Sequence, residues 1–355
     1  MNTEEKLISK KKPSFPVNKE LYDYLTEYNR NIKIPVSYED LLRFSGFISV
    51  FDKNGTDTLW IRVYYSTYEQ KEIDLSLKQM YNILHADGSE GNFDNLNVDE
   101  IDYCTFGNSK PFRVKVRNVL NDNYTYLYVK KADASRVYGL ELEDLLAPNH
   151  MNFLVHKDTI IEEHVIGIPG DVFIEEKLAG LTKEDRQRLS KEYVKFNERS
   201  TLRLLGDMRA YNYVIVPTYD FDRVQYRIRA MDFDQQSYEG NLKVYRPQFF
   251  KDNFAFVEMV QHSLQQESIE QYKNEERSIL AKRLRGSKER IEDLMKVMRK
   301  DIISKPEYVE QLKNELVVFT KDKNFKQCKT MGDILQVVFD FVVRNYESVN
   351  AYIIK

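Results

Sequence analysis

Cysteine is scarce in this chain of 355 residues, which has only Cys104 and Cys328. The two lie far apart, in segments of different character. A scaffold held by several disulfides needs more cysteines than this, and so does a zinc site with cysteine ligands. The five histidines show no spacing typical of metal ligands. The sequence therefore predicts neither a disulfide framework nor a structural zinc site.

Long apolar runs are missing as well. No stretch approaches the roughly 20 apolar residues that a membrane-spanning helix needs. Residues 1–6 do not open a secretory signal peptide. We expect a cytoplasmic protein without a membrane partner.

Neither sign of charge is in excess. The chain has 53 lysines and arginines against 56 acidic residues, for a net charge of −3. The two signs are interspersed, so nucleic acid is not favoured as a partner. The local basic cluster at 282–288 most simply marks the solvated end of a helix.

Two short segments near the centre of the chain carry acids in a suggestive pattern. Residues 206–212 contain Asp207 and, after four intervening residues, Asn212; Asp232 and Asp234 follow further on. Phosphoryl transfer needs a carboxylate that receives the proton of the attacking hydroxyl, and oxygen ligands that hold magnesium against the phosphates. Asp207 fits the first role, and Asn212 and Asp232 fit the second. The spacing alone should arise by chance about once or twice in a chain so rich in Asp and Asn.

The residues between the two segments favour a β-hairpin. Residues 213–216 are apolar and β-prone, 217–222 are typical of a turn, and 226–231 alternate large apolar with basic residues. A loop, a strand, a turn, a second strand and an acid thus follow one another.

In this order the chain resembles the protein-kinase-like superfamily, in which a hairpin after the catalytic loop ends in an Asp-Phe-Gly-type metal ligand. The motif style is closest to small-molecule kinases such as aminoglycoside and choline phosphotransferases. The resemblance implies that ATP and Mg²⁺ are cofactors and that Asp207 is the catalytic base. It gives Asn212, Asp232 and Asp234 as metal ligands and a small molecule or a protein as the hydroxyl acceptor.

The segment upstream is similar to the hinge between the two lobes of such kinases. Residues 159–165, which include Glu163, read as a strand that enters a Gly/Pro turn at 166–170. The resemblance implies that the hinge, with Glu163, contacts the nucleotide. One or two helices are expected from 173 to 205, with a helix start near Thr182.

A β-prone run at 124–129 ends in Lys130 and Lys131, and a short helix is expected over 137–146. The resemblance implies that the lysine leaving this strand contacts phosphate and pairs with an acid of the helix. We favour Lys130 with Glu141, while Lys131 and Glu143 are close rivals.

A glycine-rich phosphate loop is the element that the chain lacks. Residues 106–111 offer Gly107 and backbone amides above the phosphates, but without Gly-x-Gly-x-x-Gly a plain surface turn is equally compatible. Asp234 stands where Asp-Phe-Gly has its glycine. These departures leave room for a protein that binds nucleotide without transferring phosphate.

We therefore predict an α+β protein with the two-lobed kinase-like fold, an antiparallel small lobe, a helical large lobe and an extra N-terminal α/β segment. A hairpin over 48–65, a helix over 75–84 and a polar loop over 85–97 are expected in the extra segment. Apolar stripes predict several helices beyond 250. The predicted divisions are a lead-in with a short helix (1–34), an accessory α/β segment (35–100), the small lobe (101–166) and the large lobe (167–355).

Three functions stay open on the sequence. The first is an ATP- and Mg²⁺-dependent phosphotransferase. The second is a catalytically inactive kinase-like nucleotide-binding or scaffold protein, whose long charged helix near 271–290 could contact a protein partner. The third is a metal-dependent phosphoesterase in which Asp207, Asp232 and Asp234 hold two ions.

Overall fold

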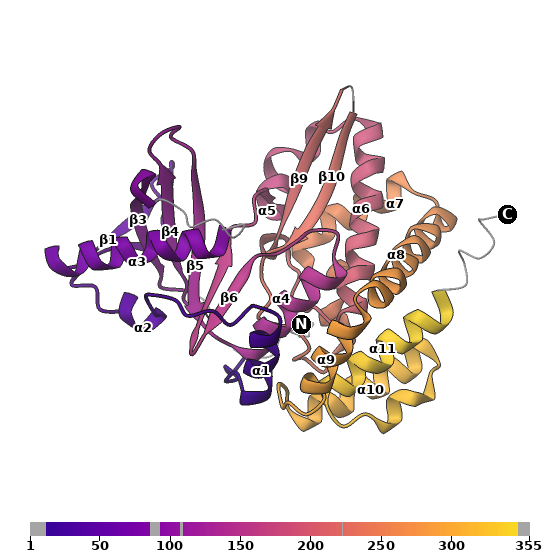
Figure 1. Ribbon diagram of the computed structural model, residues 1–355. Helices are drawn as coiled ribbons and strands as arrows, with labels where there is room; N and C mark the ends of the chain where they lie inside the picture. The colour runs from indigo at the N-terminus through magenta and orange to yellow at the C-terminus, as the bar shows by residue number, and fades with distance from the viewer. Residues whose placement is uncertain (1–11, 86–92, 107–108, 222, 347–355) are drawn as a thin grey trace, which may run out of the picture. The chain divides into compact units, whose positions relative to one another are not determined.

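The computed structural model describes residues 12–85, 93–106, 109–221 and 223–346 (Figure 1). The chain divides into two compact units. The sheet unit comprises residues 16–134 and 151–164, and the helical unit comprises 1–15, 135–150 and 165–355. The predicted α+β class with an antiparallel sheet is confirmed.

The sheet unit is built on a seven-stranded antiparallel sheet with the order β1-β2-β3-β4-β5-β7-β6. Its strands are β1 (Gly46–Phe51), β2 (Asp57–Tyr64), β3 (Leu96–Cys104), β4 (Phe112–Asn118), β5 (Tyr124–Lys131), β6 (Phe153–His156) and β7 (Thr159–Glu163). Its helices are α1 (Lys19–Glu27), α2 (Tyr38–Leu41), α3 (Thr67–His85) and the 3-10 turn η1 (Phe93–Asn95).

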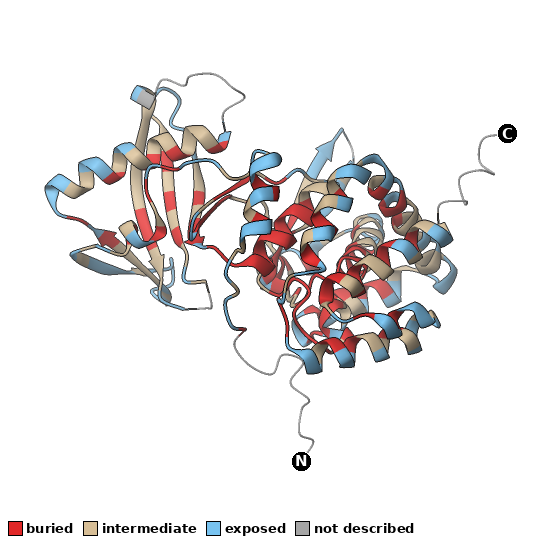
Figure 2. Cartoon of the chain, turned by 60° about the horizontal axis from the view of Figure 1, so that its bottom comes forward, coloured by how far each residue is buried: buried red, intermediate tan, exposed pale blue. Residues whose placement is uncertain are grey.

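One face of this sheet packs against α3. Successive side chains of a strand point to opposite faces, and β4 accordingly buries Val114 while Arg113 stays partly exposed. Leu77 and Met80 of α3 join Val114 in one hydrophobic core. Figure 2 shows the resulting alternation of buried and intermediate residues along the strands.

The accessory segment predicted at 35–100 is not a separate unit. Its strands β1 and β2 belong to the same sheet as β4 and β5, and the boundary at 100 falls inside β3. A β-bulge between Val98 and Glu100 explains why β3 was missed. The extra residue puts Val98 and Ile101 three positions apart, which hides the period of two that marks a strand.

Two other expectations for this segment are confirmed, whereas the polar loop expected over 85–97 lies mostly outside the described residues and ends in η1 and the first residues of β3. A hairpin joins β1 and β2, and Gly55 takes a φ of +79° in its turn, where glycine is favoured. The helix predicted over 75–84 is α3, which begins earlier, at Thr67.

The helical unit combines helices with a three-stranded antiparallel sheet of order β10-β9-β8. Its α-helices are α4 (Ala134–Leu146), α5 (Gly170–Glu176), α6 (Lys183–Leu202), α7 (Phe254–Ser263), α8 (Gln266–Gly286), α9 (Lys288–Met298), α10 (Pro306–Thr320) and α11 (Met331–Tyr346). Its strands are β8 (Ile168–Pro169), β9 (Tyr213–Asp220) and β10 (Arg223–Ala230). Its 3-10 turns are η2 (Leu178–Gly180), η3 (Ala210–Asn212), η4 (Leu242–Tyr245), η5 (Pro247–Phe249), η6 (Lys251–Asn253) and η7 (Lys323–Gln327).

The predicted hairpin after residue 212 is confirmed, with longer strands than expected. Pro217, which the sequence places in the turn, pairs with Tyr226 inside the ladder. This is possible because β8 pairs with β9 only at Val214 and Ile215, so no third strand needs an N–H group from Pro217.

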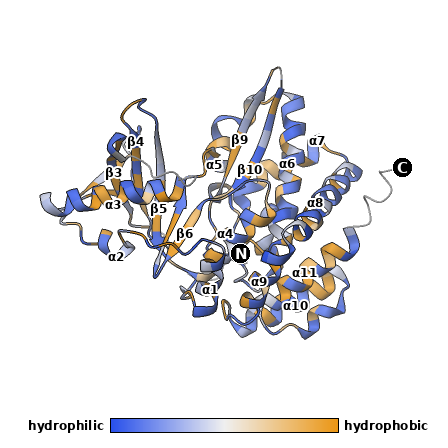
Figure 3. Cartoon of the chain, in the orientation of Figure 1, coloured by the Kyte–Doolittle hydropathy of each residue, from blue (hydrophilic) through white to orange (hydrophobic). Residues whose placement is uncertain are grey.

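The helices form where the sequence predicts them. Thr182 caps α6 by accepting a hydrogen bond from the N–H of Asp185, and the apolar stripes beyond 250 become α7 to α11. Figure 3 shows that α8 is mostly hydrophilic, whereas hydrophobic residues are frequent on α11. Buried arginines join the helices: Arg199 binds Glu276 of α8, and Arg203 binds Glu143 of α4.

The position of α4 corrects a predicted boundary. The small lobe predicted at 101–166 includes this helix, but α4 belongs to the helical unit from Ser135 onward. Its first turn is held there because the hydroxyl of Ser135 donates to the carbonyl of Gln236.

No helix in the described ranges has the length and apolarity to cross a membrane.

Two helical glycines should respond oppositely to alanine. A Cβ at Gly332 of α11 would lie 2.5 Å from the backbone carbonyl of Met298, whereas a Cβ at Gly286 of α8 would meet nothing within 4 Å. We expect Gly332→Ala to lower the free energy of unfolding by about 1–3 kcal/mol. Gly286→Ala should raise it by up to about 1 kcal/mol, because alanine loses less backbone entropy on folding.

Urea denaturation of the two variants beside the wild-type chain measures both changes. Equal stabilities of the two variants would contradict the close packing of α11 on the end of α9.

Candidate functional site

The loop that follows α6 has an unusual backbone. Leu204 and Asp207 have φ values of 51° and 58°, in the left-handed region, and Ser237 of a second loop has 51°. Leucine rarely adopts this conformation, and aspartate adopts it more readily. The buried Leu204 accepts a hydrogen bond on its carbonyl from the N–H of Ser237, at 2.8 Å. Such conformations tend to gather at functional sites.

Backbone hydrogen bonds join the two acidic segments of the sequence. The N–H of Gly206 donates to the carbonyl of Gln235 at 3.2 Å, and the N–H of Met231 donates to the carbonyl of Asn212 at 3.0 Å. The loop at 206–212, here called the Asp207 loop, therefore lies beside the loop at 231–237, here called the Asp232 loop. The fold of the helical unit brings the predicted residues of both loops together.

Asn212 holds the Asp207 loop in shape. Its side-chain Nδ2 donates to the carbonyl oxygen of Asp207 at 2.8 Å. Within the described part of the chain, Oδ1 of Asn212 has no hydrogen bond. This oxygen is therefore available to bind a cation.

The Asp207 carboxyl is held by one arginine. Its Oδ1 accepts from Nε of Arg209 at 3.0 Å, and Nη1 of Arg209 donates to Asp252 at 3.0 Å. Burial raises the pKa of Asp207 to about 7; Arg209 opposes the rise, and the charges of Asp232 and Asp252 add to it. Oδ2 of Asp207 has no hydrogen bond to any residue that the structure describes. This carboxyl can therefore take up and release a proton near neutral pH.

A second arginine binds the Asp232 loop. From α4, Arg136 donates from Nη2 to Oδ1 of Asp232 and from Nε to Oδ1 of Asp234, both at 2.7 Å. The N–H of Asp234 also donates to Oδ1 of Asp232, at 3.1 Å. One guanidinium thus fixes both acids in relation to α4.

A glycine allows α4 to lie close to this loop. A Cβ at Gly139 would stand 3.0 Å from the Cβ of Phe233 and 3.2 Å from that of Gln236. Phe233, between the two acids, is fully buried. Gly139 therefore brings the N-terminal turn of α4, with Arg136, within reach of the carboxylates.

The donor atoms suit a hard cation that shares its ligands with phosphate. Among the described residues, no three His, Cys, Asp or Glu side chains are arranged to hold a metal ion. The contacts above join four carboxylates to the guanidinium groups of Arg136 and Arg209. When Asp207 is ionised, these six groups together carry a net charge of −2. Mg²⁺ is commonly bound by one or two carboxylates together with substrate phosphates. Asn212 and Asp232 would supply oxygen ligands of this kind.

The sheet unit holds Lys130 with an acid that the sequence did not indicate. Nζ of Lys130 donates to Glu162 of β7 at 2.7 Å, and the two side chains are only 8% and 3% exposed. The predicted partner, Glu141, binds Arg290 within the helical unit, at 2.6 and 2.8 Å, and its rival Glu143 binds Arg203. The pairing of Lys130 with Glu141 is therefore corrected to Lys130 with Glu162.

The remaining predicted contacts have other surroundings. Glu163 accepts hydrogen bonds from the backbone N–H and the side-chain Nδ2 of Asn152, both at 3.1 Å. Lys131, the rival of Lys130, is exposed. Gly107 lies outside the described residues.

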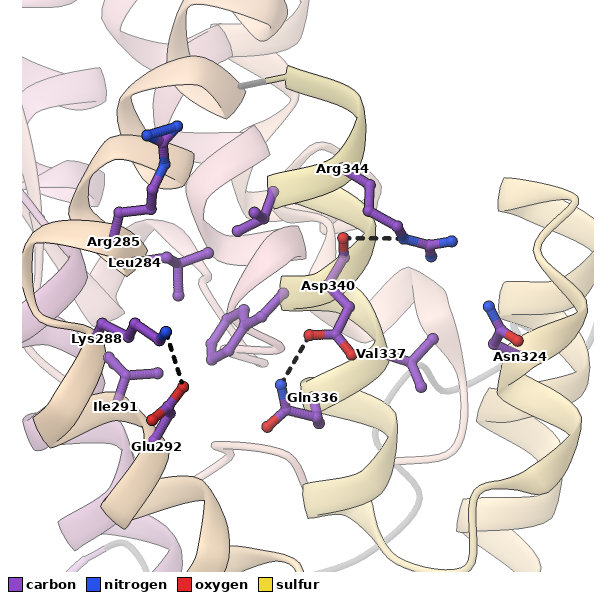
Figure 4. Close-up of a pocket in the computed structure, with 12 residues that line it drawn as sticks. Leu284, Arg285, Lys288, Ile291, Glu292, Asn324, Gln336, Val337, Asp340 and Arg344 are labelled. Carbon is purple, nitrogen blue, oxygen red and sulfur yellow. Dashed lines mark hydrogen bonds and ion pairs between the residues drawn. The ribbon is translucent and has the colours of Figure 1, made fainter. Parts of the chain in front are cut away.

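A groove of about 520 Å³ opens elsewhere in the helical unit, between α8, α9 and α11 (Figure 4). Apolar side chains such as Ile291 and Val337 line it. Lys288 pairs with Glu292 and Gln336 with Asp340 on their own helices, and Arg344 binds Asp322, which precedes η7. None of the predicted site residues lines this groove.

Comparisons of the chain with protein-family models and with curated proteins find no match. The geometry of the helical unit is therefore the basis for assigning a function.

Breaking the buried pair of Lys130 and Glu162 in the sheet unit should destabilise the protein. We expect Lys130→Met to lower the free energy of unfolding by about 3 kcal/mol or more, because it leaves the Glu162 carboxylate buried without this ammonium group. Lys131→Met, at the exposed neighbouring position, should change it by less than about 0.5 kcal/mol. Chemical denaturation measures both, and equal losses would contradict the buried pair.

Removing the charge of Asp207 should stabilise the protein at neutral pH. The folded-state pKa of about 7 lies above the ordinary value of 3.8, so ionisation of Asp207 costs folding free energy. Asp207→Asn, which keeps a residue that tolerates positive φ, should be more stable than the wild type by about 1–3 kcal/mol at pH 8. The difference in free energy of unfolding between the variant and the wild type should grow from about pH 4 to 7 and stay constant above about pH 7.

Unfolding curves of the wild type and Asp207→Asn, measured from about pH 4 to 8, test whether the raised pKa of Asp207 lowers stability. A gap that does not change with pH would contradict the raised pKa of Asp207.

Proposed function

We propose that this protein is a kinase-like phosphotransferase that moves the γ-phosphate of ATP to a hydroxyl group. The observation that carries the proposal is the Asp207 carboxyl, whose pKa is raised to about 7, in a loop hydrogen-bonded to the loop of Asp232. A carboxyl with a pKa near the working pH is suited to act as a general base.

The order of elements along the chain supports a kinase-like fold. Strand β5 with Lys130, helix α4, strand β7, helix α6, the Asp207 loop, the β9–β10 hairpin and Asp232 follow in the order that the superfamily requires. In this proposal the sheet unit is the small lobe and the helical unit is the large lobe. Lys130, held by Glu162, and Glu163 remain predictions for nucleotide contacts.

Asp207 would act on the acceptor. Arg209 binds Oδ1, so Oδ2 is the atom that would accept the hydroxyl proton as the acceptor oxygen forms its bond to the γ-phosphorus. The bond from that phosphorus to the β–γ bridging oxygen breaks, ADP leaves, and Asp207 then releases its proton to water. Asn212 and Asp232 would hold Mg²⁺, which supplies positive charge against the phosphate oxygens.

A second candidate is a nucleotide-binding protein that does not transfer phosphate. Arg136 already neutralises part of the charge of Asp232 and Asp234, and this observation favours it. No observation specifically favours the two-metal phosphoesterase: among the described residues no three His, Cys, Asp or Glu side chains are arranged to hold a metal ion.

Thermal melting with ATP and Mg²⁺ tests nucleotide binding. A ligand that binds only the folded state raises the melting temperature, and we expect a rise of about 2 °C or more with millimolar ATP and Mg²⁺. Asp232→Asn should lose the Mg²⁺-dependent part of the rise. Asp220→Asn, at the exposed end of β9, should keep it. No rise in the wild type would exclude both nucleotide-binding candidates.

An assay with γ-labelled ATP separates the phosphotransferase from the inactive nucleotide-binding protein. It measures transfer of the label to the protein or to water. We expect Asp207→Asn to bind ATP normally but to transfer label about 100-fold to 10,000-fold more slowly, the usual contribution of a general base. The wild-type rate should fall as pH drops below about 7, where Asp207 becomes protonated. Binding without transfer in the wild type would favour the inactive protein instead.

A further inference from the structure

Arg246, between η4 and η5, is a half-buried arginine that binds no acid in the part of the chain that the structure describes. Its guanidinium donates no hydrogen bond there either, whereas Arg199 and Arg203 are bound to glutamates. Burial lowers the pKa of Arg246, and the charge of Glu198 opposes the fall. Removing a charge from water without a counter-ion costs free energy, so this guanidinium lacks an anion.

Two acids of the adjoining helices are already engaged by other groups. Glu198 of α6 accepts a hydrogen bond from Nε of Arg277 at 2.6 Å. Glu315 of α10 accepts one from the N–H of Leu242 at 2.7 Å and another from Gln311 at 2.8 Å. Among the described residues, the charge of Arg246 is therefore left without a bound counter-ion.

Two phenyl rings hold the Arg246 guanidinium in place. Its Cζ lies 4.8 Å from the centroid of the Phe249 ring in η5 and 5.1 Å from that of the Phe319 ring in α10. A cation within about 6 Å of a ring centroid is attracted to the ring. The rings fix the cation without neutralising it, and its N–H groups remain available to an acceptor.

The backbone around Arg246 is also fixed. The N–H of Arg246 donates to the carbonyl of Lys243 at 3.1 Å, and its own carbonyl accepts from the N–H of Phe249 at 3.0 Å. Pro247 follows and restricts Arg246 to an extended conformation, and Tyr245 before it is fully buried. A cation that is held in this way loses little conformational entropy when it binds an anion.

A second cation and exposed apolar side chains lie beside Arg246. Nζ of Lys243 is 5.9 Å from the centroid of the Phe249 ring, and Lys243 forms no ion pair with a described residue. Phe249, Val318 and Phe319 are 37%, 68% and 50% exposed. These five residues are here called the Arg246 surface. Arginine and aromatic residues are enriched in protein interfaces and among the residues that dominate binding.

We propose that the Arg246 surface docks an acidic segment of a partner protein, in which carboxylates alternate with apolar side chains. One carboxylate would accept two parallel hydrogen bonds from the planar guanidinium, and apolar side chains would pack on Val318 and Phe319. Two cations beside apolar groups favour a peptide over nucleic acid, whose phosphates need a longer row of cations. This proposal does not rest on the proposed function.

Selection from a phage-displayed library of short random peptides on the full chain tests the proposal. We expect the enriched peptides to be rich in Asp and Glu and to contain Leu or Phe. Fluorescence anisotropy of a labelled enriched peptide then measures affinity. Arg246→Gln should weaken binding about 10-fold or more, the usual loss at a residue that dominates an interface. No enrichment, enriched peptides without acids, or equal affinities would overturn the proposal.

Arg227→Gln is the matched control, because it removes one exposed arginine from β10 of the same unit. It should bind the peptide as tightly as the wild type. An equal loss in this variant would show that net charge alone is responsible and would overturn the proposal.

Phe319→Ala covers the case in which Arg246→Gln does not fold. It removes a half-exposed ring and keeps both cations. Peptide affinity should again fall about 10-fold, and unchanged affinity would overturn the proposal.

Other occupants of the surface give different results. Binding of single-stranded DNA or of phosphatidylserine vesicles that is lost in Arg246→Gln, without peptide binding, would assign the surface to phosphate groups. Self-association that sedimentation detects in the wild type and not in Arg246→Gln would show that a second copy covers it. Either result would overturn the proposal.

Discussion

A guanidinium group cannot stay buried without anions beside it, and this constraint shapes the centre of the helical unit. Arg136 enters the interior from the first turn of α4 and binds Asp232 and Asp234. Removing one member of such a buried pair is strongly destabilising. The Asp232 loop is therefore fixed against α4, and backbone hydrogen bonds fix the Asp207 loop against it in turn.

Two arginines divide the acids of the site between them. Arg136 holds the pair on the Asp232 loop, and Arg209 holds Asp207 and Asp252. Burial outweighs Arg209 at Asp207, and the pKa of that carboxyl rises to about 7. Acids close together thus differ in their surroundings: Asp207 is buried and has a raised pKa, whereas Asp232 is paired with Arg136. The proposed function depends on this division, because general-base catalysis beside a metal needs one acid that exchanges a proton and another that binds the cation.

Local patterns predicted much of this arrangement. The hairpin after Asn212 and the N-cap of α6 at Thr182 follow from turn residues, alternation and capping. The proximity of the two acidic segments was expected from the resemblance to kinase-like proteins. Glu162 was missed because its pairing with Lys130 depends on β7 lying beside β5, which no local pattern reveals. Arg136 was missed for a similar reason, since its acids lie almost a hundred residues away.

The central claim is that Asp207, Asn212 and Asp232 surround a metal-bound nucleotide. The most direct measurement is a crystal structure of the chain with Mn²⁺ and a non-hydrolysable ATP analogue, with diffraction data that locate manganese by its anomalous scattering. The account predicts manganese bound to Asn212 and Asp232, with the terminal phosphate facing Asp207. Nucleotide bound away from Asp207, or no manganese at these residues, would contradict it.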